Sequence, residues 1–127
     1  MKRIYISGKI GEEELNSATI WKFRDAESAL LDLRFAPFNP CCDIWQRQLR
    51  KGYETERKLL GSLALDYYTY VLREDIRELS RYDAICLLPD WRQSKGARAE
   101  QAFAQATGKK IYELNEYGTL IEWQEKE

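Results

Sequence analysis

A serine, a glycine and a glutamate are spaced as Ser94-x-Gly96-x-x-x-Glu100, immediately after a long apolar run. A helix predicted over 97–106 puts Glu100 roughly one turn from its start and on its apolar arc, so the carboxylate faces the interior. Burying an isolated carboxylate costs several kcal/mol, which indicates that Glu100 has hydrogen-bonding partners or a chemical role. Because the chain has no histidine, any acid–base chemistry falls to carboxylates, Tyr, Lys or Cys.

Two further acids lie on apolar helical arcs, so position on a helical wheel does not by itself single out Glu100. Glu27 is about three turns, or roughly 15 Å, from the start of its predicted helix, and we interpret it as structural. Asp75 lies beside the apolar stripe of another predicted helix. Both a catalytic and a structural interpretation stay open for Asp75.

Aromatic side chains add a second group of candidates. Tyr5 lies between two isoleucines in a strand-like run and points to the opposite sheet face from them. Its hydroxyl needs a partner there, which Glu100 would supply, and simple core packing is the alternative. Other aromatic residues have the right character to stack on a base, although such residues also fill cores and dimer contacts: Tyr67, Tyr68, Tyr70, Trp45 and Trp91.

The first predicted strand is followed by Ser7, Gly8 and Lys9, with Gly11 two residues later. Glycines at this place let the backbone approach a phosphate or ribose, and the backbone N–H groups favour an anion. The segment matches neither the P-loop nor the dinucleotide-binding fingerprint. A plain turn is therefore the alternative interpretation.

Two polar side chains at other predicted strand ends also have two interpretations each. Asn39, between a phenylalanine and a proline, is placed either to bind a sugar hydroxyl or to brace its turn. Asp90 is placed either to hold a base or to be a solvated loop residue. Both lie in loops at the carboxyl ends of strands, where ligands bind in open α/β sheets.

These residues must be positioned by strands that alternate with helices. Short β-rich or apolar runs predict strands at 3–6, 34–38, 83–89 and 109–114, and Pro37 places the second one near a sheet edge. Helical spacing predicts helices from Asn16 or Ser17 to about 33, over 67–81 with an inward stripe of Leu72, Ile76 and Leu79, and over 97–106, ended by Gly108. Residues 41–65 predict one or two short helices. The order implies an α/β fold, a doubly wound (flavodoxin/Rossmann-like) parallel sheet of about four to five strands with helices on both faces.

Composition limits the class of protein. A length of 127 residues, 44% hydrophobic and 32% charged, predicts a single domain over 1–127. No apolar run approaches the roughly 18 residues of a membrane span, and a net charge of -1 without a basic block disfavours duplex nucleic acid. Three cysteines without a framework spacing, and a start that lacks the apolar stretch of a signal peptide, predict a cytoplasmic protein.

Together these segments resemble the nucleoside 2-deoxyribosyltransferase-like superfamily, particularly a small bacterial and phage branch related to deoxynucleoside 5′-monophosphate N-glycosidases. The matching segments are IYISGKIG, FNP, the tryptophan at 45, and REDIRELSRYDAICLLPDWRQSKGARAEQAFAQATGKKI. Roughly 46–65 lies outside the match, as an insertion. The specific part is Asp75, then Asp83, then the Ser94-x-Gly96-x-x-x-Glu100 motif.

The resemblance implies roles for individual residues. Glu100 would be the nucleophile at C1′ of a (deoxy)ribosyl group, Asp75 would protonate the departing base, and Tyr5 would orient Glu100. Ser7, Gly8, Lys9 and Ser94 would cradle sugar or phosphate. Together with Gly96 of the motif, and with Asn39, Asp90 and Trp91, which residue type and position indicate, they are the substrate-binding candidates. The resemblance implies neither a metal nor a cofactor. It also implies a homodimer or higher homo-oligomer, for which the tail, with Leu120, Ile121 and Trp123, is the candidate contact; the tail alternates weakly, so pairing with the sheet is the other expectation.

The expected function is therefore cleavage or transfer of the N-glycosidic bond of a nucleoside or nucleoside 5′-monophosphate. Two carboxylates suffice for a retaining reaction through a covalent glycosyl-enzyme. One alternative is a nucleotide-binding or sensing module of the same fold that has no turnover. Another is an interaction protein that retains only the scaffold. Release of free base from a panel of nucleotides separates these alternatives.

Overall fold

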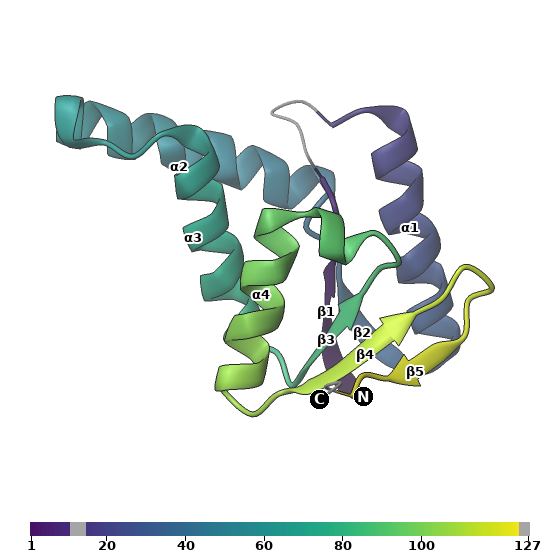
Figure 1. Cartoon of the computed structure of the whole chain (residues 1–127). Helices are drawn as coiled ribbons and strands as arrows, with labels where there is room; N and C mark the ends of the chain where they lie inside the picture. The colour runs from purple at the N-terminus through teal and green to yellow at the C-terminus, as the bar shows by residue number, and fades with distance from the viewer. Residues whose placement is uncertain (11–14, 125–127) are drawn as a thin grey trace.

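The computed structural model describes residues 1–10 and 15–124, and one five-stranded sheet forms its centre (Figure 1). The strands are β1 (Lys2–Ser7), β2 (Phe35–Phe38), β3 (Ala84–Leu87), β4 (Lys110–Leu114) and β5 (Leu120–Glu122), in the spatial order β2-β1-β3-β4-β5. The first four pair in parallel, and β5 pairs antiparallel with β4. The strand order reverses between β1 and β3, which marks the carboxyl ends of these strands as the place for a ligand.

Helices cover both faces of this sheet, which confirms the predicted doubly wound α/β fold. They are α1 (Ser17–Asp32), α2 (Asp43–Leu60), α3 (Tyr67–Leu79) and α4 (Lys95–Ala106), with short 3-10 turns η1 (Gly61–Leu63) and η2 (Trp91–Gln93). The side-chain oxygen of Asn16 accepts the backbone N–H of Thr19 at 2.9 Å and caps α1, so of the two predicted starts, Asn16 and Ser17, Asn16 is the cap and Ser17 the first helical residue. Gly108, with φ of 72°, follows the end of α4 and also matches its prediction.

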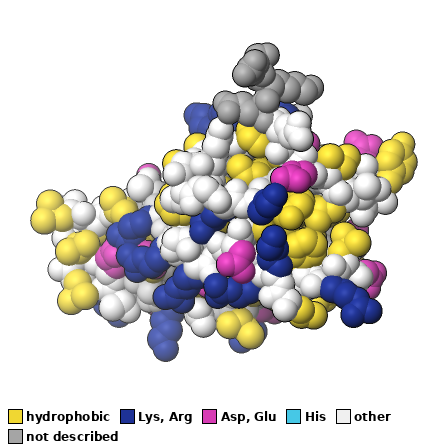
Figure 2. Space-filling view, turned by 90° about the horizontal axis from the view of Figure 1, so that it is seen from below, with side chains coloured by type: hydrophobic (Ala, Val, Ile, Leu, Met, Phe, Trp, Pro, Cys, Tyr) yellow, Lys and Arg dark blue, Asp and Glu magenta, His cyan; other side chains and the backbone are white. Residues whose placement is uncertain are grey.

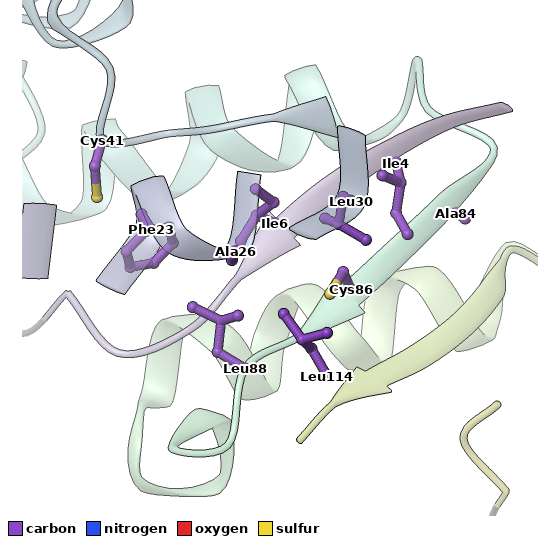
Figure 3. Packing of buried hydrophobic residues seen from close by; sticks show 10 residues of the cluster. All are labelled: Ile4, Ile6, Phe23, Ala26, Leu30, Cys41, Ala84, Cys86, Leu88 and Leu114. Atoms are coloured by element: carbon purple, nitrogen blue, oxygen red, sulfur yellow. The ribbon is translucent and has the colours of Figure 1, made fainter. Parts of the chain in front are cut away.

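The side chains of β1 divide the core into two halves. Ile4 and Ile6 point towards α1 and pack against Phe23 and Leu30, as Figure 3 shows. Tyr5 points the other way, into the cluster that α3 and α4 cover. The period of two in a strand therefore sends Tyr5, and Ser7 two residues later, to the α4 side of β1.

The structure differs from the sequence-based expectation over residues 41–65. One continuous helix, α2, occupies most of this stretch and packs along α3 (Figure 1). Only Leu49 of α2 is buried, because the helix covers α3 and not the sheet. The last turns of α2 and η1 extend past the rest of the molecule, where Leu59 and Leu63 are 79% and 81% exposed.

Of two smaller expectations, the structure confirms one and refines the other. β2 lies at the edge of the sheet, as Pro37 predicts. In α3, Leu79 is buried, but Leu72 is only partly buried while Asp75 is buried. Leu72 is partly exposed because it lines a cavity.

Surface charge is mixed. Seen from below in Figure 2, Lys and Arg side chains are most numerous on the side where α2 and α3 lie, with acidic and hydrophobic side chains among them. Across the described residues, no helix combines the length and the apolar character needed to cross a membrane.

Candidate active site

A cavity of about 540 Å³ opens at the carboxyl ends of β1 and β3. This volume falls in the usual range for a small-molecule site. One wall comes from the connection after β1, with Gly8, Lys9, Ile10 and Leu15. The opposite wall comes from α2 and α3, with Gln46, Tyr67, Tyr68, Val71, Leu72 and Asp75. The start of α4 and the turn before it complete the lining, with Gln93, Ser94, Lys95, Gly96, Ala97 and Glu100.

Glu100 is the most strongly held side chain of this cavity. It is 6% exposed, and it lies one turn and a half into α4. The hydroxyl of Tyr5 donates to Oε2 at 2.5 Å, and the hydroxyl of Ser7 donates to Oε1 at 2.7 Å. Both donors belong to β1, so the central sheet fixes the orientation of the carboxylate. Short bonds from a hydroxyl to an ionised acceptor are the strong kind of hydrogen bond.

Opposing effects set the protonation of Glu100 and of its donor Tyr5. Burial raises the pKa of Glu100 to about 7, against the lowering effect of the hydrogen bonds from Tyr5 and Ser7. Burial, with the nearby carboxylates, raises the pKa of Tyr5 well above its usual value, so its hydroxyl keeps the proton that it donates. The hydrogen bonds thus favour an ionised Glu100 in a place where burial alone would leave it neutral.

Asp75 supplies a second buried carboxyl to the same cavity. It is 6% exposed, and Nε1 of Trp45 donates to its Oδ1 at 2.8 Å. Burial and the charge of Glu100 raise the pKa of Asp75 well above its usual value, while the bond from Trp45 lowers it. Two coupled buried carboxyls of this kind share protons, and these environments favour a protonated Asp75 beside an ionised Glu100.

The start of α4 presents anion-binding groups to the cavity. Ser94 is its N-cap and accepts the backbone N–H of Ala97 at 3.1 Å. Gly96 and Lys95 line the cavity beside it. Across the cavity, a Cβ on Gly8 would lie 2.8 Å from the side chain of Leu88, so only glycine fits that position without displacement. A helix N-terminus, a lysine and an open glycine turn together form a site with a preference for negative charge.

Two side chains that lie outside the cavity lining, Asp90 and Lys22, hold the loop after β1. Asp90 accepts the backbone N–H of Lys9 at 3.0 Å through Oδ1, and Nζ of Lys22 at 2.6 Å through Oδ2. Lys22 also donates to the carbonyl oxygen of Lys9 at 2.6 Å. Asp90 therefore holds this loop, a role that neither of its two interpretations included, and it does not line the cavity. Gly11 lies outside the described residues.

Asn39 and Trp91 likewise lie outside the cavity lining. Oδ1 of Asn39 accepts the backbone N–H of Cys41 at 2.8 Å, and its Nδ2 donates to Glu27 at 3.3 Å, so the amide braces its own turn. Trp91 is buried in the cluster between the sheet and α4. Glu27, which we interpreted as structural, is accordingly a partner of Asn39 and does not line the cavity.

The aromatic candidates divide into two groups. Tyr67 and Tyr68 line the cavity. Tyr70 packs against Tyr53 between α2 and α3, with ring centroids 5.2 Å apart. Trp45 packs edge-on against an aromatic ring of β2. A stacking wall is therefore available from α3 alone.

Sequence reasoning missed the partners that lie far away along the chain. The bond from Trp45 to Asp75 spans 30 residues, and the ion pair of Lys22 with Asp90 spans 68. Gln46, whose Nε2 donates to a backbone carbonyl at 2.7 Å, also lines the cavity. The one local sequence signal that could have pointed to Gln46 is its position next to Trp45. Within 1–10 and 15–124, no three Cys, Asp or Glu side chains are grouped so that they could hold a metal ion.

The sheet and the cavity define a doubly wound α/β protein with a buried carboxyl pair where its strand order reverses. The chain belongs to the family described as Domain of unknown function (DUF4406), whose model matches residues 2–113. The match includes Tyr5, Asp75 and Glu100 and ends before β5. Searches of curated proteins and of solved structures found no match.

Proposed function

We propose that this protein cleaves or transfers the N-glycosidic bond of a nucleoside or nucleoside 5′-monophosphate, with Glu100 as nucleophile. The observation that carries the proposal is the carboxyl pair in the cavity. Glu100 is held by two hydroxyl donors, and the pKa of Asp75 is raised well above its usual value beside it. One carboxylate to attack and one carboxylic acid to donate are what a retaining glycosyl transfer requires.

In the first step, an oxygen of Glu100 attacks C1′ while the bond from C1′ to the base nitrogen breaks. Asp75 gives its proton to the departing base, which leaves as a neutral molecule, and the sugar remains bound to Glu100 as an ester. Tyr5 and Ser7 orient the attacking carboxylate. Each of them uses one lone pair of one oxygen, so each oxygen keeps another for the attack.

In the second step, water or an acceptor base attacks C1′ and the ester bond to Glu100 breaks. The Asp75 carboxylate takes the proton of the attacking group, which restores both carboxyls to their starting states. Hydrolysis and transfer thus differ only in the nucleophile of this step. No described residue need change its role between the two outcomes.

The proposal includes a phosphate position. Ser94, Lys95 and the backbone of Gly96 stand at the N-terminus of α4, and Lys9 stands across the cavity. These groups favour a 5′-monophosphate over an uncharged 5′-hydroxyl. The aromatic rings of Tyr67 and Tyr68 offer a surface for the base.

The test incubates the protein with a panel of ribo- and deoxyribonucleoside 5′-monophosphates and the matching nucleosides, and measures free base by chromatography. Release of base that is lost in Glu100→Ala supports the enzyme. Tight binding without release, measured by calorimetry, would instead indicate a nucleotide-binding or sensing module. If neither release nor binding is observed, the proposal is wrong and only the scaffold remains.

We also propose that the chain works as a homo-oligomer in the cytoplasm. All three cysteines are free, which suits a reducing compartment. The tail is less available for an oligomer contact than the sequence suggests, because β5 pairs within the sheet and Trp123 packs against the core. The exposed leucines at the end of α2 offer another apolar contact surface. Light scattering of the purified protein measures the oligomeric state.

A further inference from the structure

Three aromatic rings link the side chains that donate hydrogen bonds to Glu100 and Asp75. The ring of Phe38 stacks on that of Tyr5, with centroids 5.5 Å apart and planes at 21°. Trp45 also meets Phe38, edge-on, with centroids 5.3 Å apart and planes at 84°. At one end of this aromatic column, Tyr5 donates to Glu100, and at the other end, Trp45 donates to Asp75.

The two carboxyls stand on different helices. Asp75 belongs to α3 and Glu100 to α4, so their separation depends on how these helices are held relative to β1 and to the start of α2. The column spans those elements, because Tyr5 is on β1, Phe38 is at the end of β2, and Trp45 is in the first turn of α2. Aromatic rings are rigid and have preferred pair geometries, so they transmit position better than flexible side chains do.

We propose that Phe38 is a positioning residue, which sets the spacing of Asp75 and Glu100 through the rings of Tyr5 and Trp45. This inference rests on the proposed function. Phe38 does not line the cavity, so it acts on the pair through its neighbours. Tyr82 supports the column from the side, with its ring 5.6 Å from Phe38 and 6.4 Å from Tyr5.

Other titratable groups also act on this pair and must be considered in any titration. They are Tyr5 on β1, Cys41 after β2, and Glu74 and Glu78 on α3. Lys22 on α1 faces the same region and acts on Cys41. None of these groups is removed by a substitution at Phe38, so a change in titration of the carboxyls reports on their placement.

The chain offers a matched control on the same strand. Phe35 also begins a pair of rings, with Tyr112 at 5.8 Å, but on the face of the sheet that α1 covers. Phe38→Leu removes a ring from the column, and Phe35→Leu removes one from the opposite face. Phe38→Tyr keeps the ring, and Phe38→Met fills the space with a flexible chain should the leucine variant fold poorly.

The readout that does not depend on turnover is a carbon NMR titration of the carboxyl groups of Asp75 and Glu100 in the free protein. We expect Phe38→Leu and Phe38→Met to change the titration of both carboxyls. The pKa of Asp75 should move towards its ordinary value as the raising effect of the Glu100 charge weakens with their separation. Phe35→Leu and Phe38→Tyr should leave both curves as in the wild type. Unchanged curves in both Phe38→Leu and Phe38→Met, or equal changes in Phe35→Leu, overturn the proposal.

Kinetics give a second, independent readout when a substrate is found. Phe38→Leu should lower kcat by about 10- to 100-fold with KM changed less than threefold, which is the loss expected for misplaced reacting groups. In a Tyr5→Phe background, Phe38→Leu should lower kcat by a smaller factor, because the bond to Glu100 is already gone. If the factor by which Phe38→Leu lowers kcat is the same in both backgrounds, the proposal is overturned. If no nucleotide is turned over, the proposed function fails while the NMR titration still decides the column.

Discussion

The indole Nε1 of Trp45 donates to Oδ1 of Asp75 at 2.8 Å. This bond ties the first turn of α2 to a buried carboxyl of α3, and it opposes the burial that raises the pKa of Asp75. It also marks Oδ1 as the accepting oxygen, which leaves Oδ2 to carry the proton. The acid of the proposed reaction is therefore oriented by a helix that contacts the sheet little.

Trp45→Phe should move the high-pH limb of kcat/KM to higher pH. The indole bond lowers the pKa of Asp75, so its loss raises that pKa further and keeps the acid protonated over a wider range. The measurement is kcat/KM against pH for both proteins. A limb that moves to lower pH would show that water entering the site outweighs the lost bond.

Glu100→Gln should lower turnover by about 10³-fold or more, because the amide keeps the shape but lacks nucleophilicity. The matched control is Glu27→Gln, at a partly buried glutamate that has a hydrogen-bonding partner but lies outside the cavity. Its turnover should stay within about threefold of the wild type. Equal losses of turnover in the two variants, with circular dichroism unchanged, would contradict the assignment of the nucleophile.

The stability of the protein should fall as pH rises from about 5 to 8. Burial raises the pKa of Glu100 from 4.5 to about 7, and that of Asp75 also rises, so the folded state binds more protons than the unfolded chain in this window. With more protons bound in the folded state, the free energy of unfolding decreases with pH.

Glu100→Gln should remove part of this dependence and be more stable than the wild type at pH 8, by about 1 to 2 kcal/mol, but not at pH 5. Urea denaturation of both proteins at the two pH values measures the difference. Parallel stability curves for the two proteins would contradict the raised pKa of Glu100.

Ser94→Ala should weaken binding of a nucleoside 5′-monophosphate about tenfold and leave binding of the matching nucleoside unchanged, since the hydroxyl stands at the proposed phosphate position. It also removes the cap of α4, at a cost of about 1 kcal/mol. Asn16→Ala removes the cap of α1 at a similar cost, far from Ser94 along the chain, and controls for stability. Calorimetric titration with both ligands separates the effects. A loss shared by nucleoside and monophosphate would contradict a phosphate role.

The sequence predicts much of the fold because local signals are strong there. The alternation of strands and helices follows from hydrophobic period, and the alternation within β1 is enough to aim Tyr5 at the side where Glu100 lies. The hydrogen bond from Ser7 to Glu100 does not follow from a local pattern, because it depends on the register between β1 and β3. A strand position yields the face of a side chain but not its distance from a helix.

The rest of the site depends on contacts that no local pattern encodes. α2 buries one leucine, so its sequence resembles that of any solvated helix, and the role of Trp45 becomes visible only when α3 lies beside it. Asp90 forms an ion pair with Lys22 of α1, which is 68 residues away along the chain. Partners of this kind are set by tertiary packing, which explains why the interpretations of Asn39 and Asp90 stayed open.

The hairpin of α2 and α3 gives the molecule a divided construction. Asp75 and its donor Trp45 belong to that hairpin. Glu100 belongs to α4, and its hydroxyl donors belong to β1. Exchange of residues 43–79 between relatives would therefore move Asp75 and Trp45 together, while Glu100 and its hydroxyl donors stay with the host protein. An exchanged segment must preserve the packing of Trp45 against Phe38, because this contact joins the hairpin to β2.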